Sequence, residues 1–228
     1  MSTKTMRDVR AEIEEQRRHL NGHSFLRRLE VASDIEDLRR FMPHLYFYVF
    51  AFQDMLRLSD ELIRDPALKT ISTRHREEDA GHQVWFAQDA VQLAVERDVV
   101  WVFGPQHEPT RDASYALIAE IMGAQDDRVR LALPLVLEAA GSTFFFRVNG
   151  LLARSGDQRP LRYFSRSHQQ VEADHDIFTE AGSRALDAIE FDDATYEVAI
   201  ATVRRCFAAF DRLATHLQRY LDAPAVTP

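Results

Sequence analysis

Apolar residues recur at helical spacing along almost the whole chain. Between Phe41 and Leu56 they fall three or four positions apart, which puts them on one face of an α-helix. The stretch 45–56 is apolar nearly all round, as in a helix that is buried on every side. The pattern therefore predicts an all-α protein.

Capping residues, glycines and prolines divide this pattern into seven helices. Asp34 is expected to cap the second helix, which Pro43 bends, and Asp65-Pro66 gives the third helix a cap followed by proline at its first position. The segment 97–111, which is rich in glycine and proline, is expected to be the long loop. The expected helices span residues 5–20, 34–63, 66–96, 112–122, 127–153, 161–189 and 193–221.

No linker separates these helices, so we predict a single helical bundle. We expect a peripheral N-terminal helix and loop (1–33), a core bundle (34–221) and a frayed tail (222–228). The length of 228 residues is enough for one sizeable core.

Composition and charge narrow the classes of partner. The net charge of −8 gives no support for a nucleic-acid partner, whose phosphates attract a basic surface. The one cysteine, Cys206, excludes an intrachain disulfide, fits a reducing cytoplasm and has apolar neighbours that suggest a packing role. The first residues are polar and no run of 18 apolar residues occurs, so we expect neither a signal peptide nor a membrane span.

A possible metal-binding motif lies in the sixth expected helix. At 100° per residue, His168, Glu172 and His175 fall within about 60° of one another on a helix. Imidazoles and carboxylates are ligands that suit iron, manganese or zinc. A solvated polar helix face is the alternative.

Two further groups could complete such a site. In the third expected helix, His75, Glu78, Asp79 and His82 fall within about 100° of arc. Glu138 is the sole charge between residues 131 and 146, and a buried carboxylate needs a partner. That partner is a metal ion, a buried arginine or histidine, or an oligomer interface. The small residues that follow, Gly141 and Ser142, leave space for a ligand or form a close helix crossing.

Together these residues resemble the haem-oxygenase-like di-metal oxidases and oxygenases. Members of that family share a seven-helix fold with haem oxygenase and carry ligands on three core helices, the third with His-x3-Asp/Glu-x2-His. The resemblance covers about residues 35 to 215. The matching residues are His82, Glu138, His168, Glu172 and His175.

One position departs from the family pattern. The carboxylate that often precedes the first histidine by seven residues is replaced here by His75. Glu78 is our choice for the missing carboxylate, with Asp79 and His75 as alternatives. The second metal position therefore depends on which of these residues completes it, and the alternatives are a mononuclear protein or one that assembles its second metal only when the substrate is bound.

The resemblance implies a non-haem enzyme that binds two Fe(II) ions, or manganese, and uses O₂ to oxidise a small metabolite. Amino-acid-derived or fatty-acid-like substrates and N-oxygenation, C–C cleavage or desaturation are the implied chemistry. Glu138, bridging the metals, and His175 are the expected catalytic residues. We expect Asp54 and Arg147 to contact the substrate or to form structural salt bridges. A homodimer is expected by analogy with the fold.

Three other classes of protein fit parts of the sequence. A ferritin-like di-iron bundle would use Asp54, Asp79-x2-His82, Glu138 and Glu172-x2-His175 and would leave His168 without a role. A metal-free enzyme of the thiaminase or quinone-cofactor type would hold an organic ligand in the core. A non-enzymatic helical interaction protein would turn Glu138 toward a partner chain.

Overall fold

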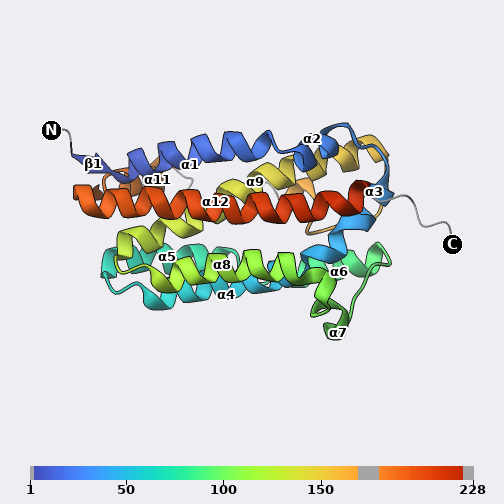
Figure 1. Ribbon diagram of the computed structural model, residues 1–228, viewed down its shortest axis with the longest axis horizontal. Coiled ribbons are helices and arrows are strands. Elements are labelled where there is room, and N and C mark those ends of the chain that lie inside the picture. The colour runs from blue at the N-terminus through green and yellow to red at the C-terminus, as the bar shows by residue number, and fades with distance from the viewer. Residues whose placement is uncertain (1–2, 169–179, 223–228) are drawn as a thin grey trace.

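Helices form almost all of the chain in the computed structural model, which describes residues 3–168 and 180–222 (Figure 1). The all-α prediction is confirmed, the described residues form eleven α-helices and two short 3-10 helices, and the seven-helix description is not confirmed. The α-helices are α1 (Met6–Asn21), α2 (Ser24–Val31), α3 (Ile35–Phe41), α4 (Tyr46–Leu62), α5 (Pro66–Glu78), α6 (His82–Gln92), α7 (Val99–Val102), α8 (Glu108–Gly123), α9 (Asp127–Ser155), α11 (Glu180–Asp187) and α12 (Asp193–Asp222). Short 3-10 helices are η1 (Met42–Leu45) and η2 (Pro105–His107).

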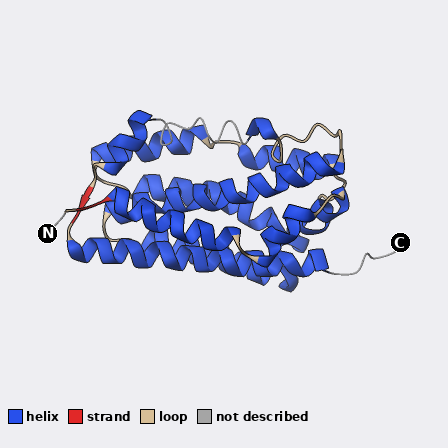
Figure 2. Ribbon diagram, turned by 90° about the horizontal axis from the view of Figure 1, so that it is seen from above, coloured by secondary structure: helices blue, strands red, loops and turns tan. Residues whose placement is uncertain are grey.

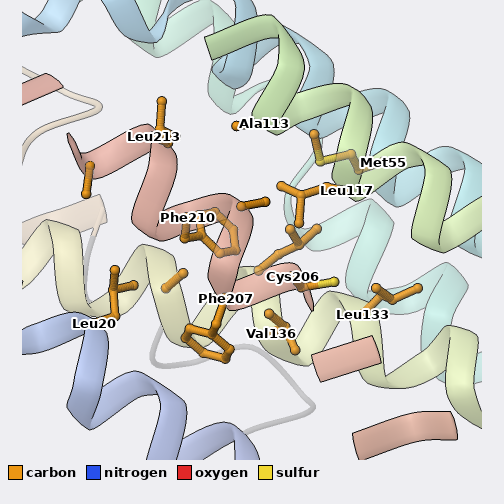
Figure 3. Close-up of a cluster of buried hydrophobic side chains, with 14 of the residues drawn as sticks. Leu20, Met55, Ala113, Leu117, Leu133, Val136, Cys206, Phe207, Phe210 and Leu213 are labelled. Carbon is orange, nitrogen blue, oxygen red and sulfur yellow. The ribbon is translucent and has the colours of Figure 1, made fainter. Parts of the chain in front are cut away.

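The helices form an elongated bundle around α9 and α12. Helices α4, α5 and α8 pack on one side of this pair, and α1 and α2 pack on the other (Figure 1). Between α12, α8 and α9 the core is filled by side chains such as Phe210, Leu117 and Val136 (Figure 3). At one end, β1 (Lys4–Thr5) pairs antiparallel with β2 (Glu190–Phe191) (Figure 2).

The N-terminal region contributes more to the bundle than the sequence predicts. Helix α1 buries Met6, Val9 and Ile13 and packs against both α9 and α12. The segment after it was expected to be a loop, but it forms α2. His23 caps this helix by accepting a hydrogen bond from the backbone N–H of Phe25 at 3.1 Å.

The second expected helix bends at Pro43 as predicted. The bend separates α3 from α4 through η1, because proline lacks the backbone N–H that a continuous helix needs. The expected N-cap, Asp34, accepts a hydrogen bond from the backbone N–H of Glu36. This tight turn carries His44 into the interior.

The expected continuous helix over 66–96 is wrong. It ends at Glu78 and restarts at His82, because Gly81 adopts a left-handed conformation with φ of 94°. Glycine takes this conformation without the steric cost that a Cβ would add. Asp79 therefore lies at the corner between α5 and α6 instead of on a straight helix face.

The segment before α8 and the segment after α9 also differ from prediction. The long loop 97–111 contains α7 and η2, and α8 starts four residues earlier than expected because Pro109 fits its first turn. The expected helix 161–189 begins with a turn, and helical conformation starts at residue 166. Its middle, and the tail beyond residue 222, lie outside the described residues.

Helix α9 is the most apolar long helix. Among the described residues it is the one helix that is long and apolar enough to cross a membrane, and 72% of its apolar window is buried inside the protein. Core packing therefore accounts for its composition. Glu138 is buried midway along this helix.

Replacing Leu117 by alanine should test whether α8 is held by its contacts with α4 and α12. Leu117 is 1% exposed, so Leu117→Ala is expected to lower the free energy of unfolding by about 2–5 kcal/mol through the cavity that it leaves. Urea unfolding followed by circular dichroism measures this change. Met122→Ala on the same helix is the control: Met122 is 60% exposed, so the loss should stay within about 0.5 kcal/mol. Equal losses in both variants would contradict the packing.

Candidate metal centre

Five buried ionisable side chains meet beside α9. They come from three parts of the chain: the corner between α5 and α6, the middle of α9, and the start of the segment at residue 166. Each has at most 6% of its surface exposed. The residues are His75, Asp79, His82, Glu138 and His168.

Short contacts join these side chains into one network. His75 Nε2 lies 2.9 Å from Glu138 Oε1 and 3.0 Å from Asp79 Oδ2. On its other side, Asp79 Oδ1 lies 3.1 Å from His82 Nδ1, and this nitrogen lies 3.3 Å from His168 Nε2. The two oxygens of Asp79 therefore face two different histidines.

His75 supplies the positive charge that compensates the buried carboxylate of Glu138. Burial by itself would lower the pKa of His75, but the hydrogen bonds and negative charges of Asp79 and Glu138 outweigh it and raise this pKa to about 10. In the protein without a metal ion, an imidazolium thus lies between two carboxylates. Of the partners expected for Glu138, the buried histidine is the one found among the described residues.

A backbone turn orients His168. Asp89, buried on α6, accepts hydrogen bonds from the backbone N–H groups of Arg162 (2.7 Å) and Phe164 (3.0 Å). This turn brings the carbonyl oxygen of Tyr163 to 2.6 Å from His168 Nδ1. A carbonyl can only accept, so Nδ1 donates to it, and Nε2 faces His82. Metal-binding histidines are commonly held in this way.

One group of donor atoms in the network is compact enough to hold a metal ion. It takes one donor atom each from His75, Glu138 and Asp79, and these atoms lie within 4.8 Å of one another. On the other side of Asp79, His82 Nδ1 lies 3.1 Å from Asp79 Oδ1 and 3.3 Å from His168 Nε2, but these three residues do not form a second such compact group within the described residues. Asp79, rather than Glu138, lies between the two sides of the network.

Of the other predicted ligands, the structure describes Glu78 but neither Glu172 nor His175. Glu78, our choice for the missing carboxylate, forms an ion pair with Arg74 at 3.4 Å, and the group beside Glu138 contains Asp79 and His75 instead. Glu172 and His175 lie outside the described residues, so their roles as ligands, and that of His175 in catalysis, remain predictions.

The two predicted substrate contacts form salt bridges, which was the alternative for both. Asp54 is exposed and pairs with Arg57 at 3.0 Å. Arg147 pairs with Glu30 at 3.0 Å and donates to Asn21 Oδ1 at 2.9 Å. Neither residue lines the cavity beside the metal centre.

A cavity of about 100 Å³ adjoins the network. Asp79, His82, Glu138 and His168 form part of its wall. Gly141 also lines it, and a Cβ built on this glycine would meet nothing within 4 Å. Gly141 therefore faces open space and does not form a close helix crossing, and space for a ligand there stays a prediction. Most of the remaining wall is apolar and includes Tyr48, Phe52, Phe144, Phe145 and Phe210.

A second group of buried histidines was missed in the sequence. His44, His107 and His216 come together from η1, η2 and α12. They occur singly on separate segments, so no spacing pattern links them.

The sequence matches no protein-family model and no curated protein. What the site can do chemically is therefore inferred from its geometry and from the resemblance of its residues to the di-metal family.

A double-mutant cycle should measure the coupling between His75 and Glu138 in protein freed of metal by a chelator. Either His75→Ala or Glu138→Ala leaves buried charge without its partner and is expected to lower the free energy of unfolding by about 3–5 kcal/mol. The double variant should lose less than the sum of the two, by at least about 1 kcal/mol.

The surface pair Asp54 and Arg57 provides the control cycle. Both residues are exposed, so their substitution by alanine should show no measurable coupling. Additive losses for His75 and Glu138 would contradict the buried ion network.

Proposed function

We propose that this protein is a non-haem di-metal enzyme of the haem-oxygenase-like type, which uses two Fe(II) ions and O₂ to oxidise a small metabolite. The observation that carries the proposal is the cavity whose wall contains two imidazoles and two carboxylates, all buried. A purely structural ion network has no need of an adjoining space for a ligand. The resemblance in the sequence supplies the family and the reaction class.

The helical arrangement supports this fold assignment. The resemblance expects ligands on three core helices, and the network draws them from α5 and α6, from α9 and from the segment at residue 166. The seven-helix description remains a proposal, in which α3 and α4 together, and α5 and α6 together, count as single bent helices.

The residues of this chain set the positions of the ligand atoms and their protonation states. His168 is held with Nε2 facing the site by the Tyr163 carbonyl, and Asp79 presents one oxygen to each side of the network. His75 must give up its proton to serve as a ligand. Bound to these donors, two ferrous ions would supply electrons for the reduction of O₂.

The cavity suggests a small, largely apolar substrate. Its wall is aliphatic and aromatic apart from the ligand residues and a few polar groups. One of these is Gln83, whose side-chain oxygen is buried and accepts no hydrogen bond within the described part of the chain. Gln83 is therefore better placed than Asp54 or Arg147 to bind an N–H or O–H group of the substrate. An amino-acid-derived or fatty-acid-like molecule fits this environment.

Two alternatives are less well supported. Asp54, which a ferritin-like centre would need as a ligand, is exposed and paired with Arg57. A thiaminase-type enzyme would need a nucleophilic cysteine, but burial raises the pKa of Cys206 to about 12 and this residue does not line the cavity. A metal-free enzyme that holds an organic ligand remains the main rival, because His75 can neutralise the carboxylates without a metal.

Anaerobic titration of metal-free protein with Fe(II) tests the proposal. The wild type should bind two equivalents that are lost or weakened in His82→Ala and His168→Ala, and His175→Ala should behave likewise. Asp54→Ala is the control and should keep both equivalents. Addition of O₂ should then oxidise the iron, faster when a suitable amino or fatty acid is present. Iron binding that is independent of His82 and His168 would overturn the di-metal assignment.

Filling the cavity should separate ligand binding from metal binding. Gly141→Leu adds a side chain where no atoms lie within 4 Å, so it is expected to abolish the thermal stabilisation produced by any small apolar acid or amine that stabilises the wild type. Iron binding should be unchanged. Gly141→Ala is the matched control, expected to raise the free energy of unfolding by about 0.4–1 kcal/mol through the helix backbone alone. Ligand binding that survives in Gly141→Leu would place the substrate elsewhere.

A further inference from the structure

Three buried histidines lie together where η1, η2 and the C-terminal part of α12 meet. His44, His107 and His216 are each at most 9% exposed. One ring nitrogen from each lies within 4.8 Å of those of the other two. None of the three belongs to the candidate metal centre, which uses a different set of residues.

Three ring nitrogens of this cluster have no hydrogen-bond partner among the residues that the structure describes. His44 Nδ1 and His107 Nδ1 lie 3.1 Å apart and can share one proton. Both ring nitrogens of His216 and Nε2 of His107 are buried, and they have no hydrogen-bond partner in the described ranges 3–168 and 180–222. Each unsatisfied buried polar atom costs about 1–3 kcal/mol, so a missing ligand is indicated.

Aromatic rings enclose the cluster. Trp101 packs against His107 with ring centroids 3.8 Å apart, and Tyr220 stacks on His44 at an interplanar angle of 14°. This shell holds the imidazole rings in place and limits the access of water. Burial lowers the pKa of His44 to about 3 and that of His107 to about 4, so both rings are neutral at pH 7 and keep a lone pair for a ligand.

We propose that His44, His107 and His216 form a second metal site, which binds one divalent ion of the zinc type. Neutral imidazole is a preferred ligand of Zn²⁺, Cu²⁺ and Ni²⁺, and the absence of a carboxylate among the three residues disfavours Mg²⁺ and Ca²⁺. The 3.1 Å separation of the His44 and His107 nitrogens is close to the roughly 3.3 Å between two ligands on one tetrahedral zinc ion.

A bound ion would link segments that are far apart in the sequence. His44 follows the Pro43 bend, His107 ends the connection before α8, and His216 lies near the end of the last helix. An ion that binds only when these segments are packed together stabilises the folded state. The role assigned to this site is therefore structural, and it does not depend on the di-metal proposal.

Titration with Co²⁺, a coloured substitute for Zn²⁺, tests this site in the full-length His82→Ala variant, which removes a ligand of the other centre. Cobalt at the histidine cluster should show the visible absorption of cobalt held by imidazoles, Zn²⁺ should displace it, and the number of bound equivalents should fall by one when His216 is replaced. Adding His216→Ala or, as a second variant that keeps a planar ring, His216→Phe should abolish this absorption. His19→Ala is the control, because the His19 side chain is 68% exposed and pairs with Glu15.

Thermal unfolding gives an independent readout. With either the wild type or His82→Ala as the parent protein, Zn²⁺ should raise the melting temperature less after His216 is replaced by alanine or phenylalanine than in the parent. No cobalt absorption in His82→Ala, or the same absorption after His216 is replaced, would overturn the proposal and leave a hydrogen-bonded histidine cluster only. That outcome would not affect the iron titration, whose ligands are different.

Discussion

Two carboxylates are buried in an apolar helical bundle, and their need for partners limits how the neighbouring helices can be placed. Glu138 lies midway along α9, a long, largely buried apolar helix, where an ionised side chain without a partner would cost several kcal/mol. His75 meets this charge directly, and Asp79 extends the network toward His82 and His168. The relative positions of α5, α6 and α9 are therefore tied to one polar cluster as well as to the surrounding apolar core.

The corner between α5 and α6 gives this network its form. On a straight helix, His75 and His82 would lie two turns apart on the same face, and both would point toward the same neighbouring helix. The left-handed conformation of Gly81 instead stops α5 and starts α6, so that Asp79 lies between the two histidines with an oxygen toward each. A carboxylate in this position is suited to bridging two ions.

The protein contains two histidine clusters of different chemical character. The cluster at Glu138 combines imidazoles with carboxylates and adjoins a cavity, which suits ions that change oxidation state and bind further ligands. The cluster at His216 contains imidazoles alone inside an aromatic shell, which suits an ion that holds segments together. Charge and access to a cavity, rather than the histidines themselves, distinguish the two.

Local spacing determined the helical class, the cap at Asp65, the bend at Pro43 and the boundaries of α9 and α12 to within two residues, because these depend on neighbouring residues alone. It also showed that Glu138 needs a partner. Only the tertiary structure decided that His75 is that partner, that Asp79 rather than Glu78 reaches it, and that three isolated histidines meet. These contacts join residues more than 60 positions apart or depend on one glycine conformation, and helix periodicity carries no information about either.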